Sequence, residues 1–320
     1  GQPKLWQVAA YYILFAGAVW ILTQKRKRER KIIAFVVACL AISILIWREP
    51  EPFSVSCLDV GQGDGLVLQT PEGNCFLVDG GSTNKSGVGQ YQILPYLKNQ
   101  GISQIDGIFI SHTDQDHISG VQEILEMDVK KLNSVKLGCL YLPEWENPPA
   151  AWEKLKQTAK EAGIPVRTLK EGDCLNAGKL QLQIIAPAVS ASGADVNEDG
   201  MVIKVKYEEF LGLLTGDIGE ETEKKLLELG VLEDVDFLKV GHHGSHYSTC
   251  QQFLDTVRPE YAVISCSSTN TYGHPSPEIT KRLEEAGCQT SFTMESGAVK
   301  VCWEKERIRI KKFLEKGNGL

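Results

Sequence analysis

The nine cysteines of this 320-residue sequence include no C-x-x-C pair and none of the spacings of a zinc finger. A metal cage built from cysteines is therefore excluded as the main chemistry of the chain. Several cysteines stand in apolar runs of strand length, as in Val263-Ile264-Ser265-Cys266. Cysteines in such runs are usually small buried hydrophobic residues, so we expect them in the core.

Internal repeats and low-complexity segments are also missing. No period of roughly 20 to 50 residues recurs, which excludes a solenoid or a propeller. The length of 320 residues allows about two domains. The hydrophobic content of 42% is enough for a large buried core.

Positive charge is scarce outside the N-terminal segment. Residues 1–50 hold 8 of the 34 Lys and Arg residues and 2 of the 41 Asp and Glu residues. This leaves 26 basic and 39 acidic residues in 51–320, a net charge of −13. Non-specific affinity for nucleic acids depends on Lys and Arg, so any nucleic-acid role of this part requires a local site.

Two uncharged runs lie close together near the N-terminus, from Leu5 to Leu22 and from Ile32 to Trp47. Each is near the roughly 20 residues that cross a bilayer, and two in tandem predict a transmembrane hairpin over about 5–22 and 32–47 rather than two buried helices. The segment Lys25–Lys31 between them holds six basic residues. The positive-inside rule favours a cytoplasmic loop here over a nucleic-acid patch, and places the chain after Trp47 on the outer side.

The rest of the chain is expected to form one domain over residues 53–320. The run Arg48-Glu49-Pro50-Glu51-Pro52 is typical of a linker, and the start at Gly1 beside a membrane span indicates a piece of a larger membrane protein. Three strands of a meander are predicted first, over 54–60, 66–69 and 75–79. Alternating helices and strands follow.

The densest group of potential ligands is His112-Thr113-Asp114-Gln115-Asp116-His117. An apolar stretch of strand length, 105–110, precedes it, and apolar residues at helical spacing follow it. The group therefore lies on a strand-to-helix connection, where α/β scaffolds usually place their chemistry. Two His and two Asp in six residues predict a metal site rather than a solvated turn.

Two further carboxylates end predicted strands. Asp79 is followed by two glycines, and beside a metal site it is expected to orient a metal-bound histidine through the ring nitrogen that faces away from the metal. Asp217 ends the run 213–217. Its alternative role is the N-cap of a helix over 218–229, but we favour a carboxylate that bridges two metal ions.

Histidines also follow two later apolar runs. His242 and His243 come directly after the strand-like run 236–241. Adjacent histidines point in different directions, so we expect only one to reach a metal, and the strand-end position favours His242. His274 stands in a loop before a predicted helix, and all these loops would open on one edge of the sheet.

In this order, the motifs Asp79-Gly80-Gly81, His112-x-Asp114-x-Asp116-His117, Thr215-Gly216-Asp217 and His242-His243-Gly244-Ser245 resemble the metallo-β-lactamase superfamily. That superfamily normally has His where this sequence has Asp114. This substitution, the run Leu58-Asp59-Val60-Gly61-Gln62-Gly63-Asp64 and the run Tyr272-Gly273-His274-Pro275 resemble the C-terminal domain of the ComEC family of DNA-internalisation competence proteins. The match spans about residues 53–303, and the preceding hairpin fits the tail of that family's membrane channel.

The resemblance implies an α/β (α+β) fold, an αββα metallo-β-lactamase sandwich, with two divalent metal ions at one edge. It assigns His112, Asp114 and Asp217 to one ion. It assigns Asp116, His117, Asp217 and His242 to the other, with His243 as the alternative to His242. We expect five more residues to support these ligands or the fold around them: Asp59, Asp64, Asp79, Asn197 and Lys239. The family usually has Ser at the position of Gly200, so a hydroxyl contact expected there is missing.

The metal ions are expected to be Mn²⁺ or Zn²⁺, since Asp114 makes the site richer in oxygen ligands, which favours harder cations. The implied activity is hydrolysis of phosphodiester bonds, by a nuclease that degrades the non-transported DNA strand during natural competence. Asp116 and Asp217 would be catalytic, and His274 and Ser245 would contact the scissile phosphate.

The expected partners are single- or double-stranded DNA, a lipid bilayer around residues 5–47, the rest of a membrane DNA channel and other competence proteins. The hydrolase domain would lie on the extracytoplasmic side of a multi-pass cell-membrane protein. Two other functions use the same cluster. One is an outward-facing metallo-hydrolase of a small phosphoester or lactone, and the other is a non-catalytic, metal-stabilised module that binds DNA or gates a channel.

Overall fold

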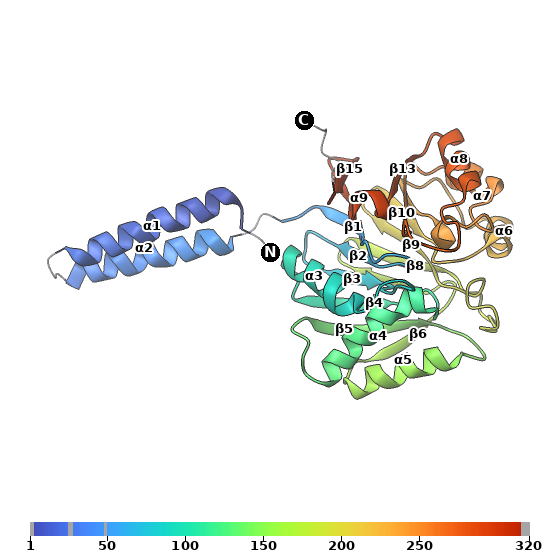
Figure 1. Cartoon of the computed structure of the whole chain (residues 1–320), viewed down its shortest axis with the longest axis horizontal. Helices are drawn as coiled ribbons and strands as arrows, with labels where there is room; N and C mark the ends of the chain where they lie inside the picture. The colour runs from blue at the N-terminus through green and yellow to red at the C-terminus, as the bar shows by residue number, and fades with distance from the viewer. Residues whose placement is uncertain (1–2, 25–27, 48–49, 315–320) are drawn as a thin grey trace. The chain divides into compact units, whose positions relative to one another are not determined.

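The structure, a computed structural model, describes residues 3–24, 28–47 and 50–314. These residues form two compact units, one made mainly of residues 1–50 and one of most of residues 51–320. Figure 1 shows the first unit as a pair of helices and the second as a layered α/β domain.

The first unit is an antiparallel pair of helices, α1 (Leu5–Thr23) and α2 (Arg28–Ile46). The side chain of Gln7 is buried between them and donates hydrogen bonds to the carbonyl oxygens of Ile44 (2.8 Å) and Trp47 (2.7 Å). Satisfying these carbonyls at the end of α2 fixes how the two helices align. The rings of Trp6 and Trp47 meet edge to face at the same end, with centroids 6.4 Å apart.

Among the described helices, α1 alone is long and apolar enough to cross a membrane. α2 begins with four charged residues, Arg28–Lys31, which the sequence had assigned to the loop. A single helix of this kind also occurs in signal sequences and in the cores of soluble proteins. Lys25, Arg26 and Lys27 of the expected basic loop lie outside the described residues, as do Arg48 and Glu49 of the expected linker.

The second unit contains two β-sheets. Sheet A has the strand order β15-β14-β1-β2-β3-β4-β5-β6. Its strands are β1 (Phe53–Cys57), β2 (Leu66–Gln69), β3 (Cys75–Val78), β4 (Gln104–Phe109), β5 (Lys136–Pro143), β6 (Val166–Leu169), β14 (Val299–Glu304) and β15 (Arg307–Lys312). The first three are antiparallel, as the expected meander requires, whereas β3 to β6 are parallel.

Sheet B has the order β13-β12-β11-β10-β9-β8-β7. Its strands are β7 (Cys174–Ala177), β8 (Leu180–Ala186), β9 (Val202–Tyr207), β10 (Phe210–Leu214), β11 (Phe237–Lys239), β12 (Tyr261–Ile264) and β13 (Gln289–Phe292). Strands β7 to β10 are antiparallel and β10 to β13 are parallel. Each sheet therefore combines a meander with parallel strands that need helical crossovers.

Helices cover the outer face of each sheet (Figure 1). Sheet A packs against η1 (Gly89–Ile93), α3 (Leu94–Gln100), α4 (Gln115–Val129) and α5 (Ala150–Glu161). Sheet B packs against α6 (Glu220–Glu228), α7 (Gln251–Val257) and α8 (Pro277–Glu285). Two short elements, η2 (Gly241–Gly244) and α9 (Thr293–Ser296), lie in the connections of sheet B.

The core has three layers because successive side chains of a strand point to opposite faces. In β2, Leu66 and Leu68 enter the cluster between the two sheets, whereas Val67 enters the cluster under the helices of sheet A. In sheet B, Ile264 packs under α7 and α8, whereas Val263 lies between the sheets. This arrangement is the αββα sandwich that the sequence predicted.

The layering brings several loops to one edge of the domain. Loops follow the carboxyl ends of β3 and β4 in sheet A and of β10, β11 and β12 in sheet B. These are the parallel strands of each sheet, and α/β sheets place their ligands at such strand ends. The potential ligands predicted from the sequence lie on the connections after β4, β10, β11 and β12, with Asp116 and His117 in the first turn of α4.

Candidate metal centre

The group after β4 is held by the start of helix α4. Asp114 occupies the N-cap position with an extended backbone, yet its side chain makes no capping hydrogen bond. Instead its Oδ2 lies 3.8 Å from Nε2 of the buried His112. The ligand atoms of His112, Asp114 and Asp116 all lie within 4.8 Å of one another. An N-cap aspartate that leaves the backbone unsatisfied is available for another charged group.

Asp217 enters the same region from the loop after β10. Its Oδ1 lies 3.3 Å from His117 Nε2, and its Oδ2 lies 3.3 Å from His243 Nε2. The carboxylate is almost completely buried, at 3% exposure. Each of its oxygens thus faces a different imidazole, so Asp217 belongs to the same ligand group as His117 and His243.

The histidine of η2 that joins the cluster is His243. Its ring is buried, its Nδ1 lies 2.9 Å from the carbonyl oxygen of Ser265, and its Nε2 lies 3.4 Å from Asp116 Oδ2. The preference for His242 therefore needs correction. Both residues have a left-handed backbone, with φ of 48° and 53°, which turns the second imidazole inward and leaves His242 half-buried at the rim.

Asp79 and Ser111 fix the orientation of the histidines from β4. Asp79 Oδ2 lies 3.0 Å from His117 Nδ1, and Asp79 Oδ1 accepts a hydrogen bond of 2.7 Å from the backbone of Ser111. The hydroxyl of Ser111 lies 3.0 Å from His112 Nδ1. With its Nδ1 engaged in this way, His117 directs Nε2 toward Asp217.

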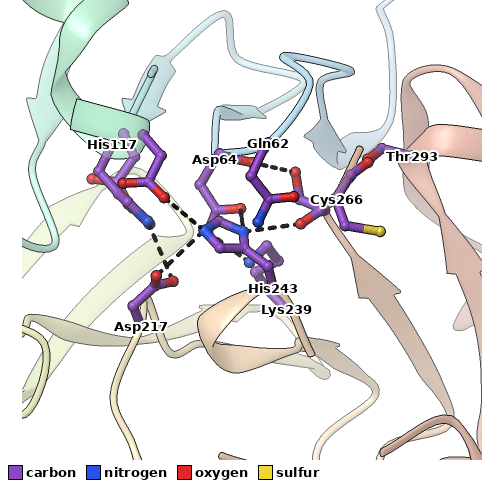
Figure 2. A network of polar contacts seen from close by, with 12 residues as sticks. Gln62, Asp64, His117, Asp217, Lys239, His243, Cys266 and Thr293 are labelled. Atoms are coloured by element: carbon purple, nitrogen blue, oxygen red, sulfur yellow. Dashed lines mark hydrogen bonds and ion pairs between the residues drawn. The ribbon is translucent and has the colours of Figure 1, made fainter. Parts of the chain in front are cut away.

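Polar atoms at the centre of the cluster fit a metal ion. Among the described residues, His112 Nε2, His117 Nε2, His243 Nε2 and Asp217 Oδ1 are buried without a hydrogen-bond partner. Unpaired buried polar atoms are costly, and four that converge indicate a missing ligand. Ligand atoms of Asp116, His117, Asp217 and His243 lie within 4.8 Å of one another. Figure 2 shows the side chains of His117, Asp217 and His243 pointing toward one another. Two imidazoles and two carboxylates suit a divalent transition metal.

Protons balance the charges of the cluster when no cation is bound. Burial works against a charge on Asp217, but His243 and His117 hold the pKa of this carboxyl well below its usual range. Burial likewise works against a charge on His243, but Asp217 and Asp116 raise its pKa to about 10. Burial and the neighbouring His117 lower the pKa of His112 to about 3, so this imidazole is neutral. A cation has to displace protons from the charged histidines.

A buried ion pair lies behind His243. Lys239 Nζ is 2.6 Å from Asp64 Oδ2 and donates a second hydrogen bond of 3.0 Å to the carbonyl oxygen of Val240. Both side chains of the pair are only 1% exposed. Asp64 Oδ1 lies 3.6 Å from His243 Nδ1, so Asp64 and Asp217 both approach the His243 ring (Figure 2). Asp64 also lies near Asp79, but its ion pair with Lys239 makes it a supporting residue rather than a ligand.

The remaining predicted residues divide into two groups. Asn197 and His274 line a cavity of about 340 Å³ that opens on Asp114, Asp116 and Asp217. Asp59 and Ser245 do not line it. Asp59 pairs with Lys85 at 3.0 Å, and Ser245 is buried with its hydroxyl directed to the backbone of Tyr247.

A steric contact explains why position 200 holds glycine and not serine. A Cβ at this position would lie 2.8 Å from the carbonyl oxygen of Asn197, which is closer than real Cβ contacts. The same carbonyl accepts a hydrogen bond of 2.9 Å from the Gly200 backbone. The tight turn at Asn197 therefore excludes a serine at position 200 in this backbone.

Sequence reasoning missed three residues of the centre: Ser111, Gln62 and Ser265. Gln62 lines the cavity and accepts a hydrogen bond of 3.2 Å from the backbone of Ser267. Ser265 holds His243 through its carbonyl oxygen. Ser111 directly precedes His112, and Gln62 lies within the glycine-rich run 58–64, so position in these motifs was the one available signal.

The sequence of this chain matches a known protein family. The family model described as the metallo-beta-lactamase superfamily matches residues 58–268. The chain belongs to the metallo-beta-lactamase superfamily, a family of metal-dependent hydrolases.

Curated relatives extend the match across most of the chain. ComE operon protein 3 of Bacillus subtilis is 29% identical over 277 residues, which are 82% of this chain and 35% of that protein. Recombination protein 2 of Haemophilus influenzae is 30% identical over 281 residues, with 87% and 32% covered. Competence protein ComA of Neisseria gonorrhoeae is 27% identical, with 81% and 34% covered. The chain spans about a third of the length of these relatives.

Solved structures share the fold at low sequence identity. The metallo-beta-lactamase fold protein YhfI from Bacillus subtilis matches with a TM-score of 0.51 and 11% identity over 75% of this chain and 96% of that one. CmlA, a diiron beta-hydroxylase from Streptomyces venezuelae, matches with a TM-score of 0.50 and 13% identity over 86% and 59%. Enzymes of different chemistry share this sandwich, so function has to be argued from the site.

Proposed function

We propose that the chain is the metal-dependent nuclease part of a DNA-uptake protein and hydrolyses phosphodiester bonds of the strand that is not transported. The observation that carries this proposal is the position of Asp217, whose two oxygens face His117 and His243. A buried carboxylate between two imidazoles is a ligand set that suits the divalent metal of a hydrolase. The name of one curated relative, competence protein ComA, supports a role in competence, and we propose that this role is DNA uptake.

Two neighbouring ligand groups support a pair of cations. One group is His112, Asp114 and Asp116, and the other is Asp116, His117, Asp217 and His243, so Asp116 belongs to both. Three carboxylates among these six side chains favour Mn²⁺ while still accommodating Zn²⁺. When bound, such ions would supply positive charge at the phosphate and activate water for attack.

The acidic lining of the cavity makes cations necessary for binding a phosphate. Asp114, Asp116 and Asp217 all face the cavity, and the domain around it carries the net charge of −13 noted above. Without cations, these carboxylates would repel a phosphodiester. The role we assign to His274, at the side of the cavity, is to position the phosphate by a hydrogen bond.

The membrane location is part of the same proposal. Helices α1 and α2 would anchor the chain in the cell membrane, with the basic segment 25–31 in the cytoplasm and the hydrolase domain outside. The partners would then be DNA, the rest of a membrane channel and other competence proteins. The apolar surface of α1 supports this location, since only 11% of its most apolar window is buried.

Cleavage of labelled DNA tests the activity. The full chain in mild detergent would be incubated with end-labelled single- and double-stranded DNA in Mn²⁺, Zn²⁺, Mg²⁺ or EDTA. We expect cleavage in Mn²⁺ that disappears in EDTA and in Asp116→Ala, but persists in Asp255→Ala. Asp255 is a matched control because it lies on the exposed face of α7, where it accepts a hydrogen bond from Gln251. Cleavage no greater than that of Asp116→Ala would remove the nuclease proposal.

The same preparation separates the two other functions. Turnover of bis(p-nitrophenyl) phosphate or a lactone without cleavage of DNA would indicate a small-molecule hydrolase. A rise in unfolding temperature with metal, without turnover of any substrate, would indicate a metal-stabilised module. In that case DNA retention would fall steeply with salt if phosphates make the contact.

A further inference from the structure

One aromatic side chain at the cavity is left exposed. Tyr272 lines the cavity, yet 60% of it is exposed to solvent. Its ring stacks on the imidazole of His274, with centroids 5.7 Å apart and an angle of 24° between the planes. The His274 ring in turn lies 6.4 Å from that of His243. The His274 ring thus links Tyr272 to His243 of the candidate metal centre.

The loop that carries Tyr272 is closed by a single side chain, Asn270. The Asn270 Oδ1 accepts hydrogen bonds from the backbone N–H groups of Tyr272 (3.1 Å) and His274 (3.0 Å). The Asn270 Nδ2 donates to the carbonyl oxygens of Ser267 and His274. These bonds fix the backbone that carries both rings before any ligand binds, which lowers the entropic cost of ordering the loop.

The base of this loop is tied to the opposite sheet. Asn84, in the segment after β3, donates hydrogen bonds from Nδ2 to the hydroxyls of Ser267 (2.8 Å) and Thr269 (3.3 Å). The same segment of sheet A carries Asp79, which orients His117. The position of the Tyr272 ring is therefore fixed relative to the metal centre and not only to sheet B.

We propose that Tyr272, backed by His274, is a stacking platform for the nucleobase next to the scissile phosphate. This inference rests on the proposed phosphodiesterase function and adds a substrate class, a strand with unpaired bases. A tyrosine face offers base stacking without sequence preference, which is how many proteins bind single strands. A base inside a duplex is already stacked on both faces, so it reaches Tyr272 only after it leaves the stack.

Exposure of a tyrosine alone does not indicate a binding site, because single exposed apolar residues are common on protein surfaces. Tyr247 provides the comparison. It is 67% exposed and contacts the tilted ring of His246, with centroids 3.8 Å apart and 40° between the planes, but it does not line the cavity. Tyr272 differs by its place beside the carboxylates and by the Asn270 bonds that hold it there.

Kinetics with and without a base test the platform. The full chain in detergent with Mn²⁺ would be given an oligothymidylate and an oligomer of equal length made of abasic tetrahydrofuran units. Tyr272→Ala should lower kcat/KM for the oligothymidylate by roughly tenfold to hundredfold, mainly through KM. Tyr272→Phe should stay within about threefold of the wild type, because the ring is retained. Tyr247→Ala is the matched control and should match the wild type.

The losses in kcat/KM caused by Tyr272→Ala and by removing the bases should not add. On the abasic oligomer, where no base is present to stack, the loss caused by Tyr272→Ala should shrink to less than about threefold. An equal loss on both oligomers would overturn the platform, because the tyrosine would then act on the phosphate backbone. No loss on the oligothymidylate would overturn it as well.

A binding measurement keeps this inference separate from the nuclease proposal. A phosphorothioate oligonucleotide containing 2-aminopurine resists cleavage, and its fluorescence falls when the base stacks. We expect quenching by the wild type and by Tyr247→Ala, and its loss in Tyr272→Ala. This result without hydrolysis of any DNA would retain the platform and remove the nuclease. Equal quenching by Tyr272→Ala and the wild type would overturn the platform whatever the activity.

Discussion

Removing one partner of the buried pair Asp64–Lys239 should destabilise the domain strongly. In Asp64→Asn, the ammonium of Lys239 keeps the carbonyl oxygen of Val240 as an acceptor but loses the carboxylate 2.6 Å away. Breaking a fully buried ion pair in this way costs about 3–5 kcal/mol, because the remaining charge stays in a medium of low dielectric. For a domain of this size we expect a fall in unfolding temperature of about 6–15 °C.

The assay is calorimetric unfolding of the full chain in detergent with EDTA, so that bound metal does not contribute to the transition. Two control variants are measured in the same way. The double variant Asp64→Leu with Lys239→Met should recover most of the loss, since apolar replacements of a buried pair are often neutral. Asp234→Asn removes a carboxylate from the exposed pair with Arg258, whose side chains are 60% and 68% exposed, and should cost less than about 1 kcal/mol.

Two results would refute this reasoning. A change below about 1 kcal/mol in Asp64→Asn would mean that water or another acceptor reaches Lys239. A double variant as unstable as the sum of the single variants would mean that the two charges do not compensate each other.

Four further outcomes are expected, three for the metal centre and one for the turn at Gly200. Saturation with Mn²⁺ or Zn²⁺ at 100 times Kd should raise the free energy of unfolding by about 2.7 kcal/mol, seen as a higher unfolding temperature that EDTA reverses. Metal affinity should rise with pH up to about 10, because the raised pKa values of His117 and His243 leave both protonated until metal displaces their protons. Titration calorimetry in buffers of different ionisation enthalpy should therefore detect proton release at pH 7. Asp79→Ala should weaken metal binding about 10- to 100-fold by freeing the His117 ring, whereas unchanged affinity would show that Asp79 does not orient it. Gly200→Ser should lower stability by about 1–3 kcal/mol through its contact with Asn197, and an unchanged unfolding temperature would contradict the close contact.

Much of the sandwich could be predicted because its strands are short apolar runs between turn signals. The meander predicted over 54–79 corresponds to strands β1 to β3. The place of β14 beside β1 could not be predicted, because pairing between strands from opposite ends of the domain depends on contacts that no local pattern encodes.

The site was predictable as far as its ligands cluster in sequence. His112, Asp114, Asp116 and His117 lie within one strand-to-helix connection. The role of His243 was not predictable, since it depends on two consecutive left-handed residues, which are uncommon for side chains other than glycine. The ion pair of Lys239 with Asp64 joins residues that are 175 positions apart in the sequence. No motif spacing relates the two residues, so their pairing was not predictable.

The division of the ligands between two sheets has a consequence for the order in which the domain becomes functional. Sheet A delivers His112, Asp114, Asp116 and His117, whereas sheet B delivers Asp217 and His243. A growing chain that has emerged only to β9 therefore holds four of these six side chains and lacks both that come from sheet B. Its first strand, β1, also remains an open edge until β14 is made. Synthesis itself thus delays hydrolytic capacity until nearly the whole domain exists.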